Sequence, residues 1–256
     1  MLVKAVCLIV NSVSYHHCNV PPPSSKTVSA ESDKIYSEGW NKMQGHLWIP
    51  YLMSYIHNFG TLIYVLTLLR GGFIGNFNVD KELGTLEDWQ AIALVAAIVG
   101  HALRVWAVQS LAQFFTFQLT IRKGHQLIGH GPYTYLRHPA YTGLLINKVA
   151  AVTLLLHHGL WDIIVAWATV LTGHIIRARI PVISQLAAWT PVSPTSTWAG
   201  LLGYSADVWF CLAFYCLVFK IITVRIPGEE KMLSEYFRKE WDDYASKRWR
   251  LVPFVY

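Results

Sequence analysis

The sequence predicts an all-α fold, a polytopic integral membrane helical bundle of about five to six transmembrane helices. Hydrophobic residues make up 54% of the 256 residues and charged residues only 14%, whereas a soluble domain carries about a quarter charged residues. Several apolar runs reach the roughly 20 residues that a helix needs to cross a bilayer. Basic residues sit at the ends of these runs, as topology signals do, and form no aromatic-interleaved stripe for nucleic acid. The partners this composition favours are membrane lipids.

The N-terminal part differs from the rest of the chain. Residues 1–46 are expected to form an N-terminal segment and a polar spacer, and residues 47–256 a membrane-embedded domain. The apolar stretch from Ala5 to Val10 is too short to span a bilayer and lacks a convincing small-residue cleavage site, so a cleaved signal peptide is not favoured.

Five apolar segments are expected to be helices: 47–69, 89–115, 141–156, 160–176 and 206–223. The break His157-His158-Gly159 between the third and fourth predicts a helical hairpin. His101 and Arg104 lie inside the second segment, where an ionisable group costs at least about 2.5 kcal/mol unless it faces protein or water. We therefore expect both to face the interior.

Charge bias predicts an orientation. The loop at 71–88 is net acidic, whereas residues 116–140 and the tail from 224 are rich in Lys and Arg and are expected to face the cytosol. Returning to a cytosolic tail requires an even number of crossings, yet three apolar segments follow residue 140. Either residues 183–202 add a Pro-broken or re-entrant segment, or one of the three does not cross.

Two polar islands adjoin membrane helices, residues 118–141 and 225–230. Parts of each segment could have a purely structural role: His138-Pro139 can start a helix, and Glu229-Glu230 can occupy a helix N-terminus. Together, on one side of the membrane, they favour a site that joins a water-soluble ligand to one arriving from the bilayer. The four cysteines contain no C-x-x-C pair, and no metal site is expected.

The islands resemble two motifs of the isoprenylcysteine carboxyl methyltransferase family. Gly131 to Gly143, GPYTYLRHPAYTG, matches G-x-Y-x-x-x-R-H-P-x-Y-x-G, and Arg225 to Glu230, RIPGEE, matches R-x-x-x-E-E. The resemblance covers residues from about 89 to 143 and from 205 to 256. The separation between the motifs exceeds the short helical hairpin of family members, which indicates an insertion around residues 177–204.

The resemblance implies a cytosolic pocket for S-adenosyl-L-methionine at the endoplasmic reticulum. The residues it places around the cofactor are Gln118, His125, Gln126, Leu127, Ile128, Tyr133, His138, Pro139, Ala140, Tyr141 and Glu229. Arg225 would meet the substrate carboxylate, and Glu230 would support it. Family members methylate the C-terminal carboxylate of the farnesyl- or geranylgeranyl-cysteine left after CAAX processing, so the implied partner is a prenylated protein or prenylcysteine entering from the bilayer.

The residue chemistry suits that reaction. A carboxylate is already ionised at pH 7, so methylation needs alignment and desolvation rather than a strong base. Arg225 can hold a carboxylate through two parallel hydrogen bonds. Alternatives are a membrane methyltransferase acting on another lipid such as a phospholipid amine, an NADPH-dependent sterol reductase-like protein with a similar RHP segment, and a scaffold without activity. A doubly wound methyltransferase fold is excluded, because the chain has no strand–helix alternation and no G-x-G-x-x-G.

Overall fold

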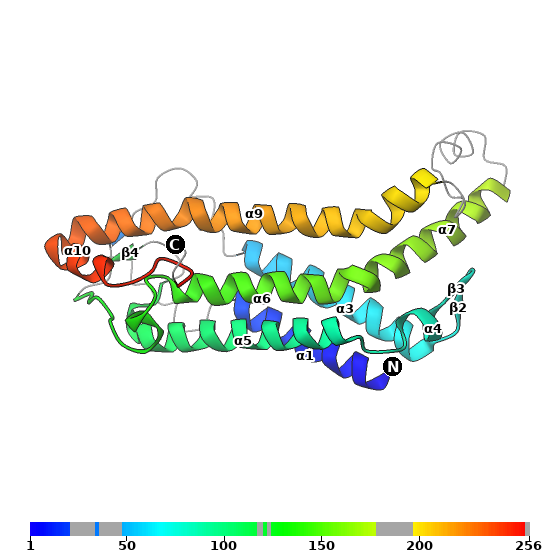
Figure 1. Cartoon of the computed structure of the whole chain (residues 1–256), viewed down its shortest axis with the longest axis horizontal. Helices are drawn as coiled ribbons and strands as arrows, with labels where there is room; N and C mark the ends of the chain where they lie inside the picture. Colours follow the sequence, from blue (N-terminus) through cyan, green and yellow to red (C-terminus); the bar gives the residue numbers. More distant parts are fainter. Residues whose placement is uncertain (21–33, 36–47, 117–119, 122–123, 178–196, 254–256) are drawn as a thin grey trace. The chain divides into compact units, whose positions relative to one another are not determined.

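The computed structural model confirms an all-α membrane fold (Figure 1). It describes residues 1–20, 34–35, 48–116, 120–121, 124–177 and 197–253. The α-helices are α1 (Leu2–Asn19), α3 (Trp48–Arg70), α4 (Val79–Leu83), α5 (Asp88–Leu111), α6 (Pro139–Leu155), α7 (Trp161–Arg177), α9 (Thr197–Phe237) and α10 (Lys239–Ser246). Short pieces complete the described chain: the 3₁₀ turns η2 (Ala112–Phe114) and η3 (Gly131–Thr134), the π-helical η4 (Leu156–Leu160), and the strands β1 (Lys34–Ile35), β2 (Phe73–Ile74), β3 (Phe77–Asn78) and β4 (Thr120–Ile121).

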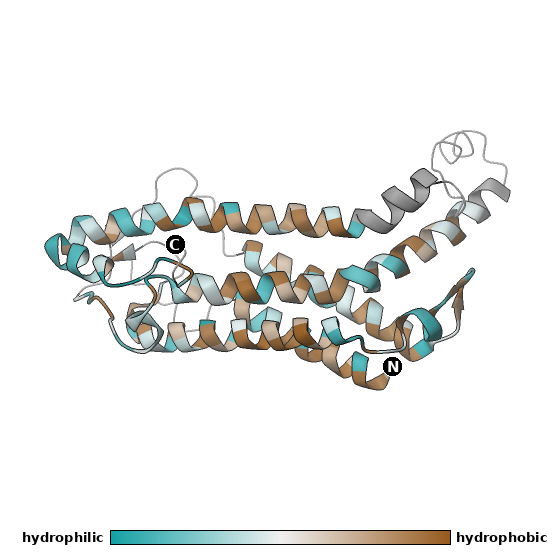
Figure 2. Ribbon diagram, in the orientation of Figure 1, coloured by the Kyte–Doolittle hydropathy of each residue, from teal (hydrophilic) through white to brown (hydrophobic). Residues whose placement is uncertain are grey.

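Four helical segments of the described chain are long and apolar enough to cross a membrane, fewer than the five to six expected. They are Ile49–Arg70, Asp88–Phe114, Pro139–Gly173 and Asp207–Phe237, and apolar residues dominate much of their length (Figure 2). The first two confirm the predicted spans at 47–69 and 89–115. The expected re-entrant or Pro-broken segment lies mostly outside the described residues.

The predicted hairpin at His157-His158-Gly159 is wrong, because the chain bends there and continues as α7 (Figure 1). His157, His158 and Gly159 leave helical geometry, with φ +46° at His158, and the N–H of Trp161 then donates to the carbonyl of Leu156. A Cβ on Gly159 would lie 2.6 to 3.1 Å from ring atoms and the hydroxyl of Tyr64. The break is therefore a bend at which Gly159 is buried while the His158 side chain is exposed, and α6 and α7 make up one candidate span.

The helix α9 is also longer than the sequence predicts. The sequence places its end near residue 223, but α9 continues through Pro227 to Phe237. Glu229 and Glu230 consequently lie inside a helix and not at its N-terminus, which removes that structural reading of the acidic pair. Of the insertion expected around 177–204, residues 178–196 lie outside the described residues.

The chain divides into two compact units. The first comprises Met1–Ser12, His57–Leu94 and Ala151–Cys216. Its apolar core gathers Leu8 of α1, Tyr64 and Leu68 of α3, and Leu154 and Ile163 from either side of the bend. β2 and β3 pair antiparallel beside this core, with Phe73 opposite Asn78.

The second unit comprises Val13–Ile56, Val95–Ala150 and Leu217–Tyr256. Its part of α5 crosses α6 at two glycines: a Cβ on Gly100 would lie 2.5 Å from the Asn147 nitrogen, and one on Gly143 would lie 2.6 Å from the Gly100 oxygen. Small residues at a crossing let two membrane helices approach closely. Buried Asn147 adds a hydrogen bond of 2.9 Å from its Nδ2 to the Ala97 carbonyl. This crossing fixes the beginning of α6, where the first motif ends.

Candidate functional site

The first motif is shaped by a glycine turn and a proline start. Gly131 has φ +62°, and a Cβ there would lie 2.6 Å from the Ser110 hydroxyl oxygen of α5. The 3₁₀ turn Gly131–Thr134 follows, and α6 then begins at Pro139, a position that proline favours. Between the two elements the N–H of Leu136 donates to the Pro132 carbonyl at 3.1 Å, and the His138 carbonyl accepts from the N–H groups of Tyr141 and Thr142 at the start of α6.

Residues 249–251 hold this passage in place. The N–H of Arg137 donates to the Trp249 carbonyl at 2.7 Å, and the N–H of His138 donates to the Arg250 carbonyl at 3.1 Å. The Thr142 hydroxyl donates to the Leu251 carbonyl at 2.7 Å. The motif backbone is therefore tied to the C-terminal segment, which also supplies a side chain to the site.

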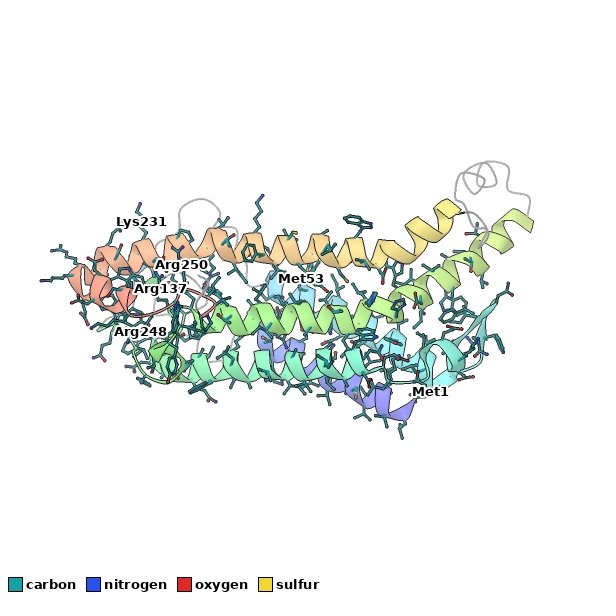
Figure 3. All side chains as sticks on the ribbon, viewed as in Figure 1. Met1, Met53, Arg137, Lys231, Arg248 and Arg250 are labelled. Atoms are coloured by element: carbon teal, nitrogen blue, oxygen red, sulfur yellow. The ribbon has the colours of Figure 1, made fainter. Side chains whose placement is uncertain are left out.

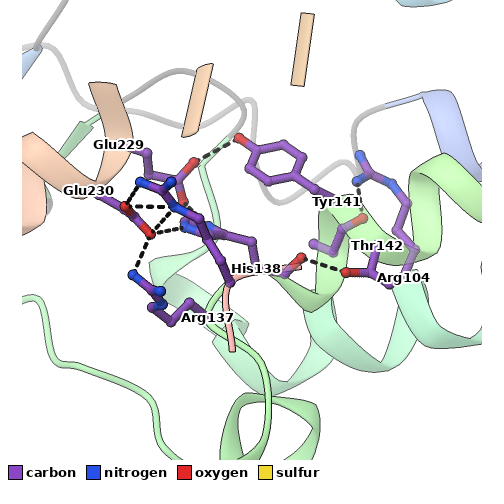
Figure 4. A network of polar contacts seen from close by, with 9 residues as sticks. Arg104, Arg137, His138, Tyr141, Thr142, Glu229 and Glu230 are labelled. Carbon is purple, nitrogen blue, oxygen red and sulfur yellow. Dashed lines mark hydrogen bonds and ion pairs between the residues drawn. The ribbon is translucent and has the colours of Figure 1, made fainter. Parts of the chain in front are cut away.

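Glu230 is the centre of a cationic cluster (Figure 4). Its Oε1 accepts from Nη1 of Arg137 at 3.0 Å and lies 3.1 Å from Nε2 of His138. Nε of Arg250 lies 3.0 Å from Oε1 and 2.9 Å from Oε2, and Nη2 of Arg250 also donates to Oε2. The Glu230 side chain is 12% exposed and the two arginines 22% each, so solvent screens these charges only in part. Figure 3 shows Arg137 and Arg250 beside each other in this unit.

Glu229 has different partners. Its Oε2 accepts from the Tyr141 hydroxyl at 2.7 Å, and its Oε1 lies 3.7 Å from Nδ1 of His138. The guanidinium of Arg225 lies 5.9 Å from the centre of the Tyr141 ring. Because Arg225 and Glu229 are four residues apart on α9, they share one helix face. A guanidinium, a phenol and a carboxylate thus meet where the two motifs face each other.

His138 lies between the two glutamates and is buried, with 3% of its surface exposed. Burial by itself disfavours the imidazolium, but the hydrogen bonds and negative charges of Glu229 and Glu230 outweigh it and raise the pKa of His138. The charged ring can donate toward both carboxylates at once, so it sets the spacing between them.

The structure brings together five of the predicted site residues: His138, Tyr141, Arg225, Glu229 and Glu230. Glu230 is held by Arg137, His138 and Arg250, while Glu229 and Tyr141 are the groups near Arg225. The charges of Glu229 and Arg225 interact, and the support of Arg225 by Glu230 stays a prediction.

The other predicted residues surround this network or precede it in the chain. Tyr133 and Pro139 are buried, and the Ala140 carbonyl accepts from Nη1 of Arg104 at 3.1 Å. The His125 ring lies 5.1 Å from Phe114 and 5.9 Å from Phe237, between centroids. Gln126, Leu127 and Ile128 belong to the irregular stretch before Gly131. Gln118 lies outside the described residues.

Arg250 belongs to this network, but the sequence does not reveal it. It is one of several basic residues after position 224, and its spacing from either motif carries no recognisable signal. Arg137 belongs to the first motif, but on sequence alone it reads equally well as an anchor at the membrane surface. Their convergence on Glu230 becomes visible only in three dimensions.

Comparison with known proteins agrees with the resemblance of the motifs. The model of the isoprenylcysteine carboxyl methyltransferase (ICMT) family matches residues 91–184, which include the first motif but not the second. A probable protein-S-isoprenylcysteine O-methyltransferase of Oryza sativa subsp. japonica is 26% identical over 166 residues, 64% of this chain and 61% of the relative. Protein-S-isoprenylcysteine O-methyltransferase B of Arabidopsis thaliana is 23% identical over 212 residues, 82% of this chain and 75% of the relative.

The chain spans about three fifths of the length of its rice relative. The predicted resemblance to this family is confirmed.

Proposed function

From its likeness to the isoprenylcysteine carboxyl methyltransferases, we propose that this membrane protein transfers a methyl group from S-adenosyl-L-methionine to the carboxylate of a prenylated cysteine. The observation that carries the proposal is the meeting of Arg225 with Tyr141 and Glu229, because it joins the two family motifs in one site. A prenylated protein or prenylcysteine entering from the bilayer is the proposed substrate.

Arg225 is the proposed carboxylate-binding residue. It is partly buried on α9, and its guanidinium can donate two parallel hydrogen bonds to a carboxylate, a geometry that the lysine ammonium cannot reproduce. Tyr141 lies against this guanidinium and is itself fixed by its hydrogen bond to Glu229. Arg225 is thereby oriented before substrate arrives, which is the requirement for aligning a weak nucleophile.

The residues present suit S-adenosyl-L-methionine. When bound, it supplies a methyl group on a positively charged sulfur, which an ionised carboxylate can attack without a base. The Glu229 carboxylate offers negative charge to such a cation, and the rings of Phe114, His125 and Phe237 offer a surface on which a purine can stack. The remaining proposed cofactor contacts are Gln118, Gln126, Leu127, Ile128, Tyr133, Pro139 and Ala140.

The proposed substrate explains the membrane setting. Each buried CH₂ of a prenyl chain favours the bilayer by about 0.8 kcal/mol, so the acceptor reaches the enzyme through lipid. α9 carries exposed apolar side chains near Arg225, among them Leu217 and Phe219. We further propose that the site faces the cytosol at the endoplasmic reticulum, on the side favoured by the basic segments.

The test is transfer of label from methyl-labelled S-adenosylmethionine to N-acetyl-farnesylcysteine by membranes that express the chain. Base-labile label on the analogue is the expected result, since a methyl ester hydrolyses in base. Arg225→Lys keeps the charge but not the bidentate geometry, and a large loss of turnover is expected. Lys220→Arg, an exposed position on the same helix, is the matched control and should be neutral.

Two outcomes would replace the proposal. Label in the phospholipid fraction, with none on the analogue, would identify an amine-methylating relative. Binding of NADPH without binding of S-adenosylmethionine would identify a reductase-like protein.

A further inference from the structure

A polar layer crosses α1, α5 and α6 within the second unit, apart from the network around Glu229 and Glu230. Its members are Ser14, Tyr15, His17 and Cys18 of α1, His101 and Arg104 of α5, and Asn147 and Lys148 of α6. Asn147 Nδ2 donates to the Ser14 hydroxyl at 3.0 Å, and the His17 and His101 ring centroids lie 6.2 Å apart. The proposed catalytic chemistry uses none of these side chains.

Two basic side chains, Lys148 and Arg104, belong to this layer. Nζ of Lys148 lies 3.5 Å from the Tyr15 hydroxyl and 4.9 Å from the centre of its ring. Lys148 and Arg104 are close enough for their like charges to act on each other. Arg104 donates to the Ala140 carbonyl at 3.1 Å, which satisfies a hydrogen bond but brings no negative charge.

No carboxylate compensates these cations within the described residues. The whole of α1 and α6, and the part of α5 from residue 95, contain no Asp or Glu. Glu229 and Glu230 of α9 are taken by Tyr141, His138, Arg137 and Arg250. No ion pair in the described part of the chain includes Arg104 or Lys148.

The thiol of Cys18 and the phenol of Tyr15 are too weakly acidic to supply a negative charge near these cations. Cys18 and Tyr15 are 1% and 2% exposed, and burial raises the pKa of the Cys18 thiol and of the Tyr15 phenol. Both therefore stay neutral at pH 7. A cation held among apolar helices without a counter-charge is costly, so the layer is suited to an anion from outside the chain.

We propose that Lys148 and Arg104 form a binding site for a phosphate group, supplied by the headgroup of an anionic bilayer lipid. Phosphate carries negative charge and several strong acceptor oxygens, which match the two cations. His17 is exposed and His101 partly exposed, so the layer reaches the surface of the second unit there. Val13, Ile98 and Trp106 of the same helices are exposed apolar side chains, at 53%, 41% and 52%, as expected for a face that contacts lipid tails.

Ligand-dependent thermal unfolding of the purified protein tests the site, and does so without reference to methyl transfer. The chain's 11 tryptophans report unfolding by fluorescence at a fixed detergent concentration. Dihexanoylphosphatidylglycerol is expected to raise the unfolding midpoint saturably, and zwitterionic dihexanoylphosphatidylcholine is not. In Lys148→Met the half-saturating concentration of the anionic lipid should rise by about tenfold or more, since a charge-assisted hydrogen bond is lost.

Matched variants make the result specific. Lys148→Arg keeps the charge and should keep the response, and Lys220→Met removes an exposed lysine of α9 and should also keep it. Lys148→Gln serves where the Met variant does not fold. A response to inorganic phosphate that Lys148→Met abolishes would support the site with free phosphate as its source. An equal response of wild type and Lys148→Met to the anionic lipid, or no response of the wild type to either phosphate compound, would overturn the proposal.

Discussion

Arg250 and Glu230 face each other as a two-pronged pair, with Nε of the arginine 3.0 Å and 2.9 Å from the two carboxylate oxygens. The pair joins the C-terminal segment to α9, and Arg137 and His138 bind the same carboxylate from the first motif. Glu230 therefore acts as the point where three separate parts of the chain are held together. Its neighbour Glu229 keeps its negative charge available toward Arg225 and Tyr141.

Arg250→Ala is expected to lower the free energy of unfolding by about 1 to 3 kcal/mol, because it removes charge-assisted hydrogen bonds to a mostly buried carboxylate. Titration with SDS, followed by fluorescence, measures the change. Lys231→Ala is the control: its ion pair with Glu235 joins side chains 76% and 50% exposed, and such pairs contribute about 0 to 1 kcal/mol. Equal effects of the two substitutions would contradict the role given to Arg250.

Tyr141→Phe removes the hydroxyl that donates to Glu229 and keeps the ring beside Arg225. A hydrogen bond to a charged group contributes about 1.5 to 3 kcal/mol, so kcat/KM in the methyl-transfer assay should fall by about tenfold or more. Tyr135→Phe, at a position 61% exposed, should leave kcat/KM unchanged. Normal kcat/KM for Tyr141→Phe would remove Tyr141 from the proposed site.

The crossing of α5 and α6 should not tolerate a methyl group at Gly143. A Cβ there would meet backbone atoms, the Gly100 oxygen at 2.6 Å and the Arg104 nitrogen at 2.7 Å, so the helices would have to separate. Gly143→Ala is expected to destabilise the protein by about 1 to 3 kcal/mol. Gly173→Ala on α7 has no atom within 4 Å of the new Cβ and should be neutral or stabilising, as alanine favours helix. The same SDS titration compares them, and a Gly143→Ala protein as stable as wild type would refute a tight crossing.

His138 makes stability depend on pH in a predictable direction. Its pKa is raised in the folded protein, so its ion pairs contribute fully below about pH 6.5, the ordinary value for histidine, and are lost as the pH rises through the raised pKa. The thermal midpoint of the wild type should therefore decline across this range more steeply than that of His138→Gln. Parallel curves for the two proteins would show that His138 is not charged in the folded state.

Much of the helical framework follows from apolar runs, because a membrane span is set by length and hydropathy alone. The helices α3 and α5 begin and end close to their predicted limits. The bend at Gly159 could not be predicted in the same way: His-His-Gly marks a break, but contact with Tyr64 decides where the chain goes next. The end of α9 could not be predicted, because Pro227 and the two glutamates suggest a helix boundary near residue 225. In the structure the helix continues, and arginines distant in the sequence, Arg137 and Arg250, compensate the charge of Glu230.

The residues of the candidate site likewise fall into those that the sequence predicts and those that it does not. His138, Tyr141, Arg225, Glu229 and Glu230 follow from motif spacing, and the structure brings them together. Arg250 could not be found, because nothing local distinguishes it from the other basic residues near it. That Glu229 shares a helix face with Arg225 follows from their spacing of four residues, but only once residues 225 to 229 are known to lie in one helix that continues through Pro227.

The bond between Arg137 and Glu230 joins residues 93 positions apart. A ribosome adding about 5 to 20 residues per second needs roughly five to twenty seconds to travel that distance. During that interval α6 has left the ribosome with Arg137 and His138 in place but without the carboxylate that they bind. The two halves of the site are thus separated in time during synthesis, and the cluster around Glu230 is complete only after Arg250 has left the ribosome.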